Sequence, residues 1–338
     1  MIRILFHNLP DDTRYAFAVA RIRALESRML DHAIITRLLR SSGTDELLKI
    51  ILDTEYGFIL NEAADTPFES VLDKELNRIY MLIRSIDPNP EWTDLWRWRY
   101  DAHNLKVILK AGLSNKEDMN HFITPSVIDP LKMIQGLEQA DYSYIPSPLK
   151  EAVERILAED IQNEKGSDDI DFIIDRALYI FLSQETRKSK NEFLIHLAAI
   201  MIDLINLRSF LRVKGFKGTD NIFLRSFIPG GYISEKRFHP HEEGQSDEIL
   251  HDIIENSPYT ELKPFLDSKN PAVFEAGTDN FIIAYLRQTR QRAFGVEPLI
   301  GYMLAKELEI KNLRVLYLAK ANALEEEFIK ERLRETYV

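Results

Sequence analysis

Four aspartates near the middle of the chain have a spacing that could support metal chemistry. Residues three and four apart share one face of a helix, so Asp168, Asp171 and Asp175 would point the same way. Carboxylates arranged like this bind Mg²⁺, which in turn would hold a diphosphate group. The alternative is that Asp169 and Asp171 form the acidic first turn of a helix carrying Phe172, because negative charge stabilises that end of a helix. We interpret the aspartates as this helix start, since no second aspartate-rich motif accompanies them.

A group of histidines is the second candidate for metal chemistry. His239, His241 and the pair His251-Asp252 have a spacing loosely similar to that of metal-dependent phosphohydrolases. The remaining ligands of such a site are missing, and the histidines lie in or beside a polar insert over residues 238–248. We therefore interpret them as surface residues and predict no metal, no other cofactor and no catalytic residue.

A third pattern occurs three times at intervals of roughly a hundred residues, which is typical of an internal repeat. An acidic residue is followed three positions later by Asn-Leu and then by a cation, and we call this pattern the signature. Its copies are Asp101, Asn104, Leu105 and Lys106; Asp203, Asn206, Leu207 and Arg208; and Glu309, Asn312, Leu313 and Arg314.

Helix geometry assigns different tasks to the parts of the signature. The acid lies about 60° from the asparagine and the cation about 160° from it. We expect the asparagine, assisted by the acid, to satisfy exposed backbone groups at the end of a packed helix. The cations then face outward with neighbouring cations, as solvated charge or as a basic lining that binds an acidic partner. These partner-binding candidates are Lys106 with Lys110, Arg208 with Arg212, and Lys311 with Arg314.

The segments around the signatures are predicted to be helical and to recur in the same order, which indicates an all-α fold. A first helix is expected from Tyr15 to Leu30. Each repeat then has a short helix, a helix opened by serine, a helix carrying a phenylalanine, and the signature helix. The short helices are expected at 29–39, at 123–134 and near Tyr232; the serines are Ser42, Ser147 and Ser257; the phenylalanines are Phe68, Phe172 and Phe281. The expected repeats are 1–118, 119–225 and 226–338.

Several of these segments resemble the C-subunit family of V-type (A-type) ATP synthases, the counterpart of the V-ATPase d subunit. The similar segments are 15–28, 100–110, 297–314 and 332–338, and the similarity extends over essentially the whole chain. The resemblance implies three similar helical bundles arranged with pseudo-threefold symmetry as a funnel. It also implies a non-catalytic rotor subunit that links the central shaft to the membrane proteolipid ring. The insert at 238–248 has no clear counterpart in the family.

Composition limits the remaining functions. The net charge of −11 argues against nucleic-acid binding, and no phosphate-binding Gly-x-x-x-x-Gly-Lys-Ser/Thr motif is present. The N-terminus does not have the pattern of a secretory signal. The most apolar stretch, Phe193–Leu207, contains His196 and Asp203 and is too short to span a membrane. We predict a cytoplasmic protein, peripheral on the membrane, that binds no small-molecule substrate.

Two other functions are kept as alternatives. A generic helical-repeat scaffold would have the same fold and the same lack of catalytic motifs. An all-α, Mg²⁺-dependent isoprenoid synthase would use the aspartates at 168–175. Trp92, Trp96 and Trp98 form a partner surface or, as we prefer, part of the core at a repeat junction.

Overall fold

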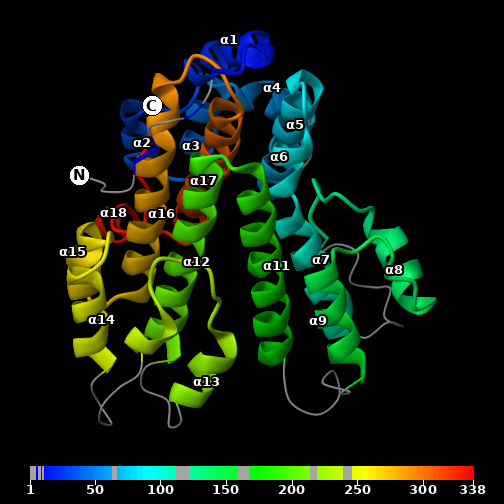
Figure 1. Ribbon diagram of the computed structural model, residues 1–338. Helices are drawn as coiled ribbons and strands as arrows, with labels where there is room; N and C mark the ends of the chain where they lie inside the picture. The colour runs from blue at the N-terminus through cyan, green and yellow to red at the C-terminus, as the bar shows by residue number, and fades with distance from the viewer. Residues whose placement is uncertain are drawn as a thin grey trace. The chain divides into compact units, whose positions relative to one another are not determined.

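The described part of the protein is built entirely from helices (Figure 1). The structure is a computed structural model that describes residues 5–6, 9, 11–62, 67–111, 122–158, 167–213, 219–238 and 246–338. Within these ranges every regular element is helical, which confirms the all-α prediction. The chain forms two compact units: unit 1 contains Met1–Thr93 and Pro258–Val338, and unit 2 contains Asp94–Ser257. The division into three repeats stays a prediction.

Unit 1 combines the two ends of the chain around one long helix. This helix, α17, contacts α1, α3, α5 and α16, and most of its residues are buried. Its buried side chains, among them Leu299, Tyr302, Leu313 and Leu316, therefore form the centre of the core. The helices of unit 1 are η1 (Thr13–Tyr15), α1 (Ala16–Glu26), α2 (His32–Leu39), α3 (Thr44–Leu52), α4 (Tyr56–Glu62), α5 (Phe68–Ile86), η4 (Thr260–Leu262), α15 (Lys263–Asp267), α16 (Pro271–Arg287), η5 (Gln288–Gln291), α17 (Glu297–Ala321) and α18 (Glu326–Lys330).

Unit 2 is a continuous stretch of chain centred on α11, which packs on α7, α9 and α12. The two long helices α11 and α12 run side by side in Figure 1. α6 (Glu91–Leu95) spans the change from unit 1 to unit 2 along the chain. The helices of unit 2 are α7 (Trp98–Ala111), α8 (Pro130–Glu138), α9 (Ser147–Ala158), α11 (Ser167–Ser189), α12 (Glu192–Val213), α13 (Thr219–Ser226), η3 (Glu235–Phe238) and α14 (Ser246–Glu255).

Two short helices begin later than the sequence indicated. α2 starts after Asp31, whose carboxylate accepts from the Ile34 N–H at 2.8 Å. α8 starts after Asp129, which accepts from the Leu131 N–H at 2.8 Å. Such side chains satisfy the free N–H groups of a first turn. The residues just before both caps were predicted to be helical, but they are not in a helix. Signature acids bind their peptide groups instead, as described below.

The apolar helix α12 belongs to the core of unit 2. It has 22 residues and is long and apolar enough to cross a membrane, so the prediction that this region is too short was wrong. Within the protein, however, 67% of its most apolar window is buried, including Asp203 and Asn206. The helix is apolar all round because it is surrounded by other helices.

Two of the three tryptophans contribute to packing within unit 2. Trp96 is completely buried, and the ring of Trp98 contacts Phe181 edge-on with centroids 5.7 Å apart. Trp92 is half-buried. The core interpretation therefore holds for Trp96, since buried aromatic rings contribute large apolar areas to a core, whereas Trp98 is half-buried.

Candidate functional site

Each signature asparagine binds one residue of a returning chain segment through both of that residue's peptide groups. The asparagine Oδ1 accepts from the peptide N–H, and its Nδ2 donates to the peptide C=O. The pairs, with N–H and C=O distances, are Asn104 with Ile123 (2.9 and 3.1 Å), Asn206 with Ile228 (2.9 and 2.8 Å) and Asn312 with Arg334 (2.8 and 2.9 Å). All three asparagines are buried. A carboxamide is the side chain that supplies a donor and an acceptor together, which explains its recurrence.

The first two signature acids bind the peptide groups that follow. Asp101 accepts from the N–H groups of Val127 and Ile128 at 2.7 and 2.8 Å. Asp203 accepts from those of Tyr232 and Ile233 at 2.7 and 3.1 Å. Burial raises the pKa of Asp101 to about 6, although the hydrogen bonds from Val127 and Ile128 oppose this rise. Each acid thus fixes the chain where the next repeat is expected to begin.

The third acid reaches back to the beginning of the chain. Glu309 accepts from the Leu30 N–H at 2.6 Å, across a sequence separation of 279 residues. Leu30 directly precedes the cap Asp31 of α2, just as Ile128 directly precedes the cap Asp129 of α8. The third signature therefore binds the residue before the α2 cap in the way that the first signature binds the residue before the α8 cap.

A buried charge cluster surrounds Glu309 in unit 1. The Lys306 ammonium is 1% exposed, donates to Glu309 at 2.6 Å and lies 3.5 Å from Glu75. It also lies 4.4 Å from the ring centroid of Tyr56, whose hydroxyl donates to Glu309 at 2.8 Å. Burial, followed by the charges of Glu309 and Glu75, raises the pKa of Tyr56 well above its ordinary value. Arg78 forms a second ion pair with Glu75 at 2.7 Å. Every charge in this cluster therefore has an opposite partner, as burial requires.

The signature cations do not stand alone on a solvated face. Lys106 and Lys110 pair with Asp175 and Asp171 on α11, each at 2.7 Å. Lys311 pairs with Glu275 at 2.6 Å and with Asp279 at 2.8 Å. Arg314 pairs with Glu69 and Asp73 on α5. These acids compensate much of the positive charge of the expected stripes, and the partner lining stays a prediction.

Three of the candidate cations gather around one cavity in unit 2. Lys106, Arg208 and Arg212 line it together with Arg99, between α7, α11 and α12, and its volume is about 800 Å³. Asp169, Asp171 and Asp175 line it as well. The cavity therefore carries mixed charge and suits a polar partner side chain better than a free metal ion.

The metal interpretations find no support among the described residues, where no group of three potential ligands lies close enough to hold an ion. Asp169 and Asp171 do lie in the first turns of α11, which begins at Ser167. Asp171 and Asp175 are occupied by lysines. Asp252 pairs with Arg237 at 2.9 Å, whereas His239 and His241 lie outside the described residues.

Sequence reasoning missed the buried cluster around Lys306. A lysine inside an apolar segment, three residues before the signature acid, was the available signal, because helix residues three apart are neighbours. Glu75 and Tyr56 gave no such signal, since both come from distant helices.

Comparison with known proteins then gives the family. The family described as "ATP synthase (C/AC39) subunit" matches residues 18–332. The chain belongs to this family. Among similar proteins, the C subunit of the V-type sodium ATPase of Enterococcus hirae is 24% identical, covering 94% of this chain and 97% of its own length. The C subunit of the A-type ATP synthase of Methanocaldococcus jannaschii is 25% identical (94% and 86%), and that of Pyrococcus abyssi is 24% identical (96% and 91%). The matched range contains all three signatures.

Proposed function

We propose that this chain is the non-catalytic central-rotor subunit of a V/A-type rotary ATPase. It couples the central shaft to the membrane proteolipid ring and acts on the cytoplasmic face of the membrane. Similarity to the C subunits of V-type and A-type enzymes over nearly the whole chain supports this role. The absence of a Gly-x-x-x-x-Gly-Lys-Ser/Thr loop from the sequence is compatible with nucleotide chemistry in other subunits.

The observation that carries the proposal is that the first and third signature helices make equivalent contacts. The first signature helix, α7, packs against α11 and pairs Lys106 with Asp175. The third, α17, packs against α5 of the first repeat and pairs Arg314 with Glu69. In both cases a signature helix packs against the phenylalanine-carrying helix of another expected repeat, and the signature cation pairs with an acid on that helix. This contact links the expected first repeat to the second, and the third to the first. We infer that three bundles form a closed funnel with pseudo-threefold symmetry.

A closed funnel suits the transmission of torque. An open row of repeats has two free ends that bend independently, because each repeat contacts only its neighbours. Closure through Glu309 and Lys306 removes those ends. The buried ion pairs resist opening of this closure, because separating them leaves a buried charge without a partner, which costs free energy.

ATP-driven ion transport in inverted membrane vesicles tests the function. Vesicles lacking this chain should lose transport, and the purified chain should restore it. Affinity purification of a tagged chain from solubilised membranes should recover shaft and ring subunits together. Unimpaired transport without the chain, or recovery of no ATPase subunit, would rule the proposal out and favour the generic scaffold.

A further inference from the structure

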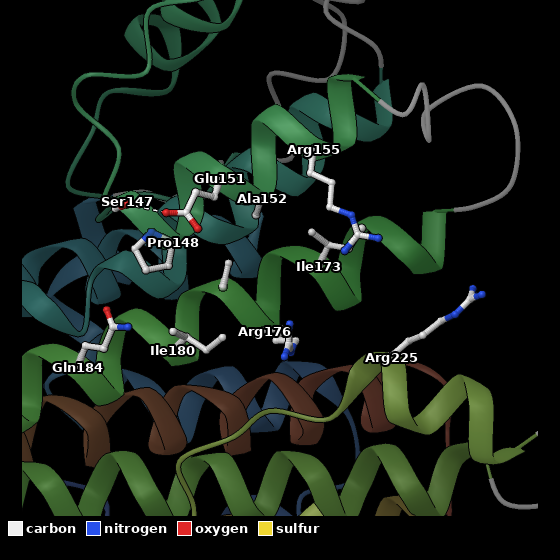
Figure 2. Close-up of a pocket in the computed structure, with 11 residues that line it drawn as sticks. Ser147, Pro148, Glu151, Ala152, Arg155, Ile173, Arg176, Ile180, Gln184 and Arg225 are labelled. Atoms are coloured by element: carbon white, nitrogen blue, oxygen red, sulfur yellow. Dashed lines mark hydrogen bonds between the residues drawn. The ribbon is translucent and has the colours of Figure 1, made fainter.

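The face of α11 opposite the mixed-charge cavity forms a second groove, between α9, α11 and α13. Its volume is about 380 Å³ (Figure 2). Arg155, Arg176 and Arg225 come from three different helices and lie at one end of the groove in Figure 2. Ser147, Glu151 and Gln184 lie at the other end. We call this feature the arginine groove.

The floor of the arginine groove is apolar. Ala152 and Ala177 are nearly buried and face each other's helices, with Ile173 and Ile180 beside them. Two small side chains at the contact of α9 and α11 leave the space that larger residues would fill. The groove is therefore large enough for about two or three apolar side chains of a partner.

The charges of the arginine groove are unevenly distributed. Glu151, the one acid among its described lining residues, accepts from the Ser147 hydroxyl at 2.8 Å at the far end. The Arg176 Nε donates to the Phe227 carbonyl at 3.1 Å, which anchors this guanidinium beside the groove. Arg225 is exposed and has no ion pair within the described parts of the chain. The other face of α11 differs, because its aspartates are paired with lysines.

We propose that the arginine groove binds an acidic amphipathic segment of another subunit of the complex. Apolar side chains of that segment lie on the alanine and isoleucine floor, and its carboxylates face the arginines, which bind carboxylates in fork geometry. A bare phosphate would leave the apolar floor unused. A positive groove on a protein of net charge −11 also selects for a partner that places its acids there. This inference rests on the proposed function and adds the chemistry of one partner segment.

Site-specific photo-crosslinking in the assembled complex tests the inference. Benzoylphenylalanine in place of Gln184 should crosslink, in complexes isolated from membranes, to a subunit segment in which Asp or Glu alternates with apolar residues. The additional substitution Arg225→Glu should lower the crosslink yield by about tenfold, the loss expected of one charge-assisted contact. Lys150→Glu is the matched control, because Lys150 lies on α9 outside the groove and pairs only weakly with Glu154 at 3.7 Å.

The outcomes separate this inference from the proposed function. Recovery of the complex without a crosslink from position 184, or with crosslinks only to phospholipid or to a segment without acids, overturns the groove assignment alone. An equal crosslink yield with Arg225→Glu overturns it too, provided that both variants keep the wild-type unfolding midpoint. Failure to recover any ATPase subunit with the wild-type chain instead overturns the proposed function.

Discussion

The Glu309 carboxylate accepts a hydrogen bond from the Leu30 N–H at 2.6 Å, and so joins the third signature helix to the segment just before α2. Asp101 and Asp203 use both carboxylate oxygens for successive peptide groups. Glu309 uses one oxygen for Leu30 and the other for Tyr56 and Lys306. The link between Glu309 and Leu30 joins segments that are far apart in the sequence. The buried ion pair between Glu309 and Lys306 reinforces this link.

Glu309→Gln should destabilise unit 1 strongly. The substitution removes the charge that compensates the buried Lys306, and breaking such a pair from one side costs about 3–5 kcal/mol. Urea unfolding measures the change. Glu327→Gln is the control, since Glu327 pairs with Lys330 at 3.6 Å on the surface, where a pair contributes less than about 1 kcal/mol. Equal effects of the two variants would show that Lys306 does not depend on Glu309.

Asn206→Ala should lower the free energy of unfolding by about 2–4 kcal/mol, because the buried N–H and C=O of Ile228 both lose their partner. Hydrogen exchange at the Ile228 amide should accelerate as well. Asn256→Ala removes an exposed amide bonded to Asp252 in the same unit and should cost much less. Unchanged protection of Ile228 would contradict this role of the asparagine.

Asp101 should make unit 2 more stable as the pH falls from neutral towards 4. Its folded pKa of about 6 lies above the ordinary value of 3.8, so the folded state binds a proton that the unfolded chain releases in this window. This stabilisation is fully present below about pH 4 and is lost as the pH rises through 6. The measurement compares the free energy of unfolding of the wild type with that of Asp101→Asn at each pH. The difference, wild type minus variant, should rise by up to about 3 kcal/mol on acidification. A pH-independent difference would argue against the raised pKa.

Gly231→Ala should disturb the second signature. A β-carbon at this position would lie 2.0 Å from the Asp203 Oδ1, so the carboxylate that binds Tyr232 and Ile233 must move. Such overpacking typically costs about 1–3 kcal/mol. Gly43→Ala is the control, because a β-carbon there meets nothing within 4 Å. Thermal unfolding should show a lower midpoint for the first variant only.

Local pattern was enough to predict the helices but not their partners. Apolar periodicity and capping residues predicted an all-α chain, and the signature indicated that its asparagines satisfy backbone groups. The prediction placed those groups at the end of the asparagine's own helix, whereas they belong to a segment about 20 residues further along the chain. The residues that they bind could not be predicted, because nothing in the sequence near Asn312 or Glu309 points to Arg334 or Leu30. For the same reason, the sequence could not show that the signature cations form ion pairs with acids of the same protein. Their acidic partners lie on other helices, and only tertiary packing brings Lys106 to Asp175.

The discontinuous composition of unit 1 determines when it can fold during synthesis. Unit 2 is one uninterrupted stretch, so it can assemble as soon as residue 257 has left the ribosome. Unit 1 must wait for α17 and for Arg334 before Leu30 and Asn312 acquire their partners. The nascent N-terminal helices therefore remain without their packing surface until α17 has been synthesised, and this interval is when they most need protection from aggregation.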